Sequence, residues 1–151
     1  MPAFPSYVFN RGLELTARQE AGLLTADTIL VLLMRDTYTP ARDQLTVADI
    51  VAAELGVTGY ARKVLANASV TRVDAPSNWA YLDGDDLQWD DLAAGDKVRY
   101  VVLAHEGAND GARALISAHA FAADIDTGGV FPLGWPAPAL GGILLFQSPQ
   151  T

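Results

Sequence analysis

The chain has 151 residues, half of them apolar and 19% charged, with a formal net charge of -8 and no cysteine. Its length and composition predict one globular domain, residues 1–151, with enough apolar side chains for a core. The acidity argues against a nucleic-acid partner, because phosphate binding requires clustered Lys and Arg. The lack of cysteine excludes disulfides and thiolate metal sites.

The C-terminal segment, residues 127–151, is uncharged but contains four prolines and five glycines. These residues are incompatible with a continuous membrane-spanning helix, so we expect no membrane partner. The first residues, Met1–Ser6, lack the basic and apolar segments of a signal peptide. We therefore expect a soluble chain made in the cytoplasm.

The N-terminal third predicts two short helices around a buried strand. Apolar residues at helical spacing predict an amphipathic helix over Tyr7–Leu24, weakened by two glycines. The six apolar residues Ile29–Met34 have the length of a buried strand. Thr46 is a suitable N-cap for a short helix over Val47–Leu55, which Gly56 would end.

The rest of the chain predicts strands. We expect one strand over Tyr60–Val73, a turn at Asp74–Asn78, a short strand at Trp79–Leu82 and an acidic turn at Asp83–Asp86. Two further strands, Lys97–His105 and Arg113–Phe121, should pair antiparallel across the loop Glu106–Gly111, and a final strand should span Gly142–Phe146. The expected fold is mainly β, an antiparallel sandwich or jelly roll with one or two short helices in the N-terminal third.

One triplet, Asp126-Thr127-Gly128, matches the fingerprint of aspartic proteases, in which two such aspartates share a proton. Only 23 residues follow Gly128, whereas those proteases place most of their fold after the triplet. A turn between strands is therefore the preferred interpretation. A small hydrolase using Asp126 in a dimer remains the enzymatic alternative to a chain that is not an enzyme.

No metal or cofactor is expected. Six aspartates crowd residues 83–96, but the sixth and twelfth places counted from Asp83 are Gln88 and Ala94, where a calcium loop needs Gly and Glu. A looser calcium site stays open as an alternative to a solvated acidic surface. The pair His105-Glu106 resembles the start of a zinc-protease helix, yet residue 109 is Asn and His119 is the only other histidine.

The uncharged C-terminal segment also contains large apolar side chains between prolines. Prolines disfavour a central strand, so aromatic groups on such a rigid loop are typical of a protein interface. The residues expected to form that interface are Phe131, Leu133, Trp135, Leu144 and Phe146. The alternative is that this segment completes the core.

Four motifs in order carry a family resemblance. They are Asp27-Thr28-Ile29 with Val31, Leu33, Tyr38 and Pro40; Gly59-Tyr60-Ala61-Arg62; Asp83-Gly84-Asp85-Asp86-Leu87-Gln88-Trp89; and Val98-Arg99-Tyr100-Val101. Together they resemble a family of small structural proteins in tailed-bacteriophage virions, over residues 27–115.

The resemblance implies a non-enzymatic virion protein, and we expect a capsid decoration (cement) protein that braces the outer shell. Its implied partners are the major capsid protein and copies of itself in a homotrimer, and its implied location is the capsid exterior. A tail, neck or fibre component that contacts the host is the alternative, with Trp79, Tyr81 and Trp89 as candidate contact residues. A calcium-stabilised binding module is a further alternative.

Overall fold

A computed structural model describes residues 6–9, 28–73, 79–136 and 143–147. The described part contains antiparallel strands and two 3-10 turns, so the expectation of a mainly β, antiparallel fold is confirmed. The strands are β1 Ser6–Val8, β2 Ile29–Arg35, β3 Lys63–Val64, β4 Ser69–Val73, β5 Trp79–Asp83, β6 Leu87–Leu92, β7 Lys97–His105, β8 Leu115–Asp126, β9 Gly129–Leu133 and β10 Leu144–Gln147. The turns are η1 Val47–Asp49 and η2 Val51–Ala53.

The main sheet has five strands in the order β1-β8-β7-β2-β3. Residues Ile29–Met34 of strand β2 are all apolar, and both faces of the strand are buried over this length. Val31 and Leu33 point into one apolar cluster, while Leu30 and Leu32 point into a second cluster on the opposite face. The first cluster also holds Trp89 and Phe131 of the β6–β9 pair, and the second holds residues of the 3-10 segment.

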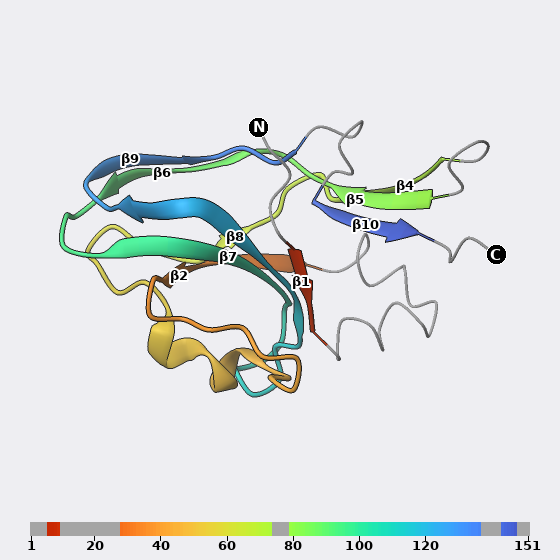
Figure 1. Cartoon of the computed structure of the whole chain (residues 1–151), viewed down its shortest axis with the longest axis horizontal. Helices are drawn as coiled ribbons and strands as arrows, with labels where there is room; N and C mark the ends of the chain where they lie inside the picture. Colours follow the sequence, from red (N-terminus) through yellow and green to blue (C-terminus); the bar gives the residue numbers. More distant parts are fainter. Residues whose placement is uncertain (1–5, 10–27, 74–78, 137–142, 148–151) are drawn as a thin grey trace.

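A second layer covers the first of these faces (Figure 1). Strand β6 pairs with β9, and the preceding strand β5 pairs with β4 and β10 in a three-stranded sheet. Figure 1 shows β6 and β9 above β7 and β8 at one end of the molecule, with β4, β5 and β10 at the other end. The chain passes directly from β5, the central strand of the three-stranded sheet, into β6 through residues 84–86.

The β7–β8 hairpin is the most extensive strand pair, and its antiparallel pairing was correctly predicted. Its register is irregular near the end of β8. Tyr100 pairs with Ala120 and Val98 with Ile125, so one residue of β7 lies opposite four residues of β8. Residues 122–126 are consequently exposed along the sheet.

The helix predicted over Val47–Leu55 is wrong, because the structure has two 3-10 turns there and the described residues contain no long α-helix. Ile50 separates the turns with φ -122° and ψ -10°, outside the helical region. The Asp49 carboxylate accepts the backbone N–H groups of Leu45 and Thr46, which lowers the pKa of Asp49. Leu55 then bonds its N–H to the Leu33 carbonyl, which draws the chain back to β2.

The strand predicted over Tyr60–Val73 is two strands in different sheets. Asn67 separates them in a turn with φ +52°, a conformation that Asn tolerates better than most residues. Strands β6 and β9 were not predicted. Of the helix predicted at Tyr7–Leu24, Tyr7 and Val8 belong to β1, while residues 10–24 and the predicted turn at 74–78 lie outside the described residues.

Candidate functional site

Three of the predicted interface residues lie in the hydrophobic core of the protein. Phe131, Leu133 and Trp135 are 5%, 1% and 8% exposed and belong to the core between the β6–β9 pair and the main sheet. Phe131 contacts Trp89 and Phe121 edge-on at centroid distances of 6.2 and 5.9 Å. Their prediction as exposed anchors is therefore corrected: these residues complete the core, as the alternative interpretation held.

Trp135 bonds to the segment that links β5 to β6. Its backbone N–H donates to the Asp86 carboxylate at 2.9 Å, and its indole N–H donates to the Asp85 carbonyl at 3.0 Å. The acidic turn thus holds the end of β9 against the start of β6. The other two predicted interface residues, Leu144 and Phe146, lie on β10 opposite Leu82 and Ala80, and their side chains fall outside the described part.

The residues between the buried ones point outward. Val130 is 59% exposed and Pro132 is also exposed, since successive residues of a strand face opposite sides. The proline accords with its place in a two-stranded sheet, where each strand has an open edge. The outward side chains of this segment are therefore Val130 and Pro132, which alternate with the buried residues of the prediction.

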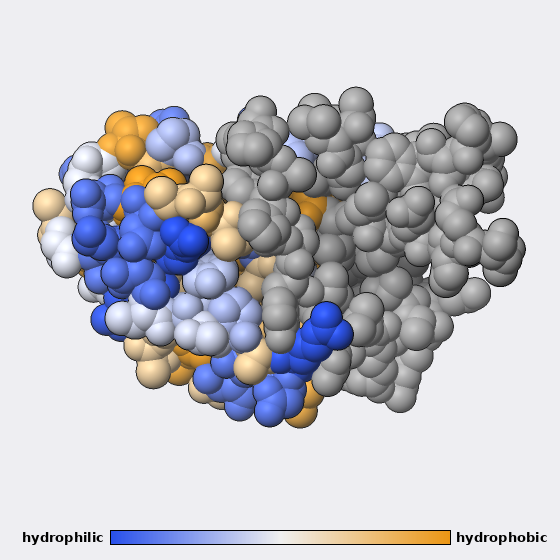
Figure 2. Space-filling view, viewed as in Figure 1, coloured by the Kyte–Doolittle hydropathy of each residue, from blue (hydrophilic) through white to orange (hydrophobic). Residues whose placement is uncertain are grey.

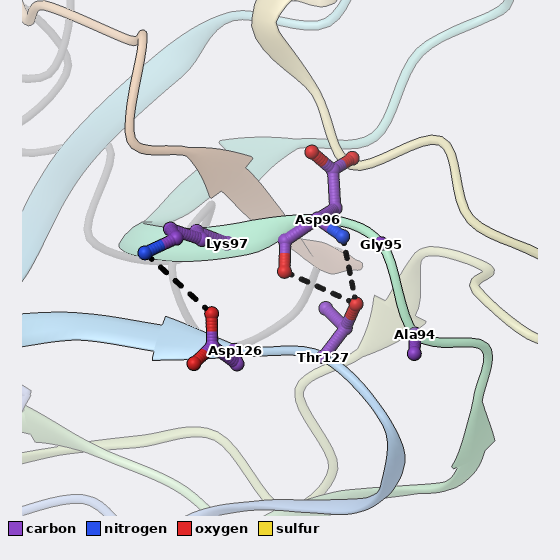
Figure 3. Close-up of a pocket in the computed structure, with 6 residues that line it drawn as sticks. All are labelled: Ala94, Gly95, Asp96, Lys97, Asp126 and Thr127. Atoms are coloured by element: carbon purple, nitrogen blue, oxygen red, sulfur yellow. Dashed lines mark hydrogen bonds and ion pairs between the residues drawn. The ribbon is translucent and has the colours of Figure 1, made fainter.

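Asp126-Thr127-Gly128 is the turn between β8 and β9, as predicted. The Asp126 side chain is 82% exposed and lies 3.7 Å from the Lys97 ammonium. The Thr127 hydroxyl bonds the backbone of Asp96, and these residues line an open hollow of about 360 Å³ (Figure 3). Figure 3 shows the Asp96 carboxylate turned away from the Lys97–Asp126 pair, so the hollow does not bring two carboxylates together.

The aspartates of residues 83–96 do not converge. The Asp85 carboxylate accepts the Asn67 amide at 2.7 Å, that of Asp86 accepts Trp135, and that of Asp90 accepts the Gln88 amide at 2.7 Å. Among the residues that the structure describes, no three acidic or histidine side chains are grouped as metal ligands. The Asp85 and Asp86 carboxylates instead hold neighbouring loops in place through these bonds.

The two histidines lie in different surroundings. His105 is half-buried at the end of β7, and His119 is 1% exposed within β8. The His119 imidazole lies 2.9 Å from the hydroxyl of buried Ser117 and edge-on to Trp135 at 6.4 Å. Burial lowers the pKa of His119 to about 4, because the interior disfavours the charged ring.

A network of ion pairs, in which Arg and acidic side chains alternate, was not predicted from the sequence. Arg62 contacts Glu54 and Asp110, each at 2.6 Å, and Arg113 contacts Asp110 and Glu106, each at 2.7 Å. Hydrogen bonds from Arg62 and Arg113 lower the pKa of Asp110 to about 2. This network joins the 3-10 segment to the β7–β8 loop, and no local sequence pattern indicated it.

Tyr60 extends the network to the main sheet. Its hydroxyl donates to the Glu54 carboxylate at 2.7 Å and accepts the backbone N–H of Leu33 at 3.1 Å. Burial, with the nearby Glu54 charge, holds the pKa of Tyr60 far above its usual value. The charged residues of this region therefore serve to fix loops to β2.

The chain matches no family model, no curated protein and no solved structure. Within the described residues, none of the helical segments has the length and apolar character needed to cross a bilayer.

Proposed function

We propose that this chain is a non-enzymatic structural protein of a tailed-bacteriophage particle, and that it decorates the capsid exterior as a cement protein. The proposal starts from the four motifs, whose order and rough spacing resemble those of that family. Its partners would be the major capsid protein and further copies of itself, with a homotrimer as the expected assembly.

The observation that carries the proposal is that the four motifs meet in one cluster. Leu33 of the first motif bonds the Tyr60 hydroxyl of the second, and the Tyr60 ring stacks on Trp89 of the third at 6.4 Å. Val101 of the fourth motif is buried in the same core. Residues separated by up to 68 positions therefore share one packing role, which supports treating the motifs as a single pattern.

The structure also explains why the second motif has a glycine at position 59. Gly59 has φ +89°, and a Cβ at this position would lie 1.9 Å from the Asp91 carbonyl oxygen. Only glycine permits this approach of the loop to β6. The neighbouring Thr58 carbonyl accepts the Ala93 N–H at 2.9 Å, so the Gly59-Tyr60 pair joins β6 to β2.

We also propose that the sheets form a sandwich of the jelly-roll kind. The inner face of β6–β9 packs on the Val31 and Leu33 face of the main sheet, as two layers of a sandwich would. A scaffold of this kind is rigid, and an acidic surface keeps many copies of a protein from associating unspecifically. Both properties suit a protein that stands on a shell.

Gold-labelled antibody against the purified protein, applied to purified virions, tests this function. Label spread over the heads is the expected result, and label confined to the tail or neck would favour the fibre or connector alternative. Of the aromatic residues that suggested a host contact, Trp89 is 2% exposed, which weakens that alternative. Particles without label would overturn the virion role.

A further inference from the structure

We propose that the outward face of the β6–β9 pair docks on a positively charged surface of the capsid shell. The residues of this outer β6–β9 face are Gln88, Asp90, Asp91, Val130 and Pro132, all exposed. The inference rests on the proposed function, because it names the shell as the partner. It assigns to this face the contact that the sequence had suggested for the buried Phe131, Leu133 and Trp135.

The face combines an apolar centre with uncompensated negative charge. Val130, at 59%, has the highest exposure of the large apolar side chains in the described part of the chain. Pro132 lies opposite Gln88 in the pair, so a second exposed apolar residue follows Val130 along β9. Figure 2 shows apolar and hydrophilic surface side by side at the end of the molecule where Figure 1 draws β6 and β9.

An irregularity in the strand pairing places two carboxylates beside Val130. The register shifts between Trp89 and Leu92, both of which are buried, while Asp90 and Asp91 between them are exposed. A bulge of this kind puts two residues of one strand opposite one residue of its partner. The β6 strand therefore presents two negative charges where a regular strand would present one.

None of the ion pairs among the described residues involves either of these two carboxylates. Lys97, Arg99, Arg62 and Arg113 pair with carboxylates elsewhere, at Asp126, Asp124, Glu54 and Asp110. Within the described residues, Asp90 accepts a hydrogen bond from Gln88 and neither it nor Asp91 forms an ion pair. A partner with Lys or Arg around an apolar hollow fits both the charge and the exposed Val130.

Zero-length carbodiimide crosslinking of intact virions tests the contact directly, because it joins carboxylates only to amines that touch them. Crosslinked peptides that join Asp90 or Asp91 to shell lysines are expected. Crosslinks to the shell from other carboxylates, with none from Asp90 or Asp91, would overturn the docking face and leave the virion role intact. Absence of the protein from the particles would overturn the proposed function, and the inference with it.

Variants measure the contribution of the face. Purified Val130→Ser and the double variant Asp90→Lys/Asp91→Lys, added to particles that lack the protein, should each bind about tenfold or more weakly. The matched controls, Leu45→Ser and Asp43→Lys, change an exposed apolar and an exposed acidic residue on a different segment and should bind normally. Normal binding by the β6–β9 variants, with unchanged thermal unfolding, would overturn the assignment. Binding of the native protein should also weaken as salt rises.

Discussion

The hydroxyl of Tyr60 lies 3.1 Å from the backbone nitrogen of Leu33 and accepts its hydrogen bond, on the side of β2 where β3 has already ended. Strand β3 covers only Leu30 and Val31. A side chain thus supplies the acceptor that a longer neighbouring strand would have supplied, and the same hydroxyl donates to Glu54.

Tyr60→Phe should therefore destabilise the chain. The variant keeps the ring on Trp89 but leaves the Leu33 N–H and one Glu54 oxygen without this partner, at a cost of about 1–3 kcal/mol. Urea unfolding measures the loss. Tyr100→Phe, which changes a half-buried tyrosine on β7, is the matched control. Equal stability of Tyr60→Phe and the native chain would contradict the structural role of this hydroxyl.

The Arg62 network should show strong coupling between its members. Arg62→Met leaves Glu54, whose side chain is 9% exposed, without its ion pair, and should cost about 2–4 kcal/mol. Adding Glu54→Gln should recover part of that loss, because the unpaired charge is gone. A double-mutant cycle monitored by urea unfolding checks this, and simple additivity of the two effects would argue against the coupling.

Stability should fall in mild acid because of His119. The unfolded chain protonates this histidine near pH 6.5, whereas the folded chain keeps it neutral until about pH 4. The unfolded state therefore binds more protons between these values, and the free energy of unfolding should decrease by about 3 kcal/mol from pH 6.5 to pH 4.

His119→Gln removes this titration while keeping a group that can bond Ser117. The pH dependence between 6.5 and 4 should flatten in this variant, as measured by urea unfolding at several pH values. His105→Gln, which replaces the other histidine of the chain, is the matched control. A native slope in His119→Gln would assign the acid sensitivity to other groups.

Calcium should leave the unfolding temperature unchanged. The carboxylates of Asp85 and Asp86 are directed to Asn67 and Trp135 by hydrogen bonds, so they are not arranged around a common ion. Thermal unfolding with excess calcium and with EDTA should coincide. A rise of several degrees with calcium would restore the binding-module alternative, since an ion bound to the native state raises stability by mass action.

The sequence was most informative where one physical requirement dominated. Ile29–Met34 and Lys97–His105 were predicted as strands because continuous apolar runs of that length fit a sheet covered on both faces. The helix at Val47–Leu55 was wrong because its local spacing is helical, while the bonds that decide the backbone are long-range ones to Leu33 and the β7–β8 loop.

The candidate site was harder to predict than the sheets. In Val130–Leu133 the composition is uniformly apolar, so it does not reveal which side chains face inward. The register of β9 against β6 decides which side chains face inward. Strand β6 itself was not predicted, because its acidic sequence does not have the pattern of a strand. The Arg62 network was equally hidden, because Asp110 lies 48 positions from Arg62 along the chain.

The irregular end of β8 has a consequence for how copies of this protein behave when they stand close together. β1 covers the outer side of β8 only at Ser117–His119, so a flat continuation of β8 would offer its outer N–H and C=O groups to the same strand of a neighbouring molecule. Here four residues of β8 lie opposite one residue of β7, and Asp124 within that stretch is held by Arg99. A bulged and charged edge is a poor template for strand pairing. This end of β8 should therefore not join neighbouring copies of the protein into a continuous sheet.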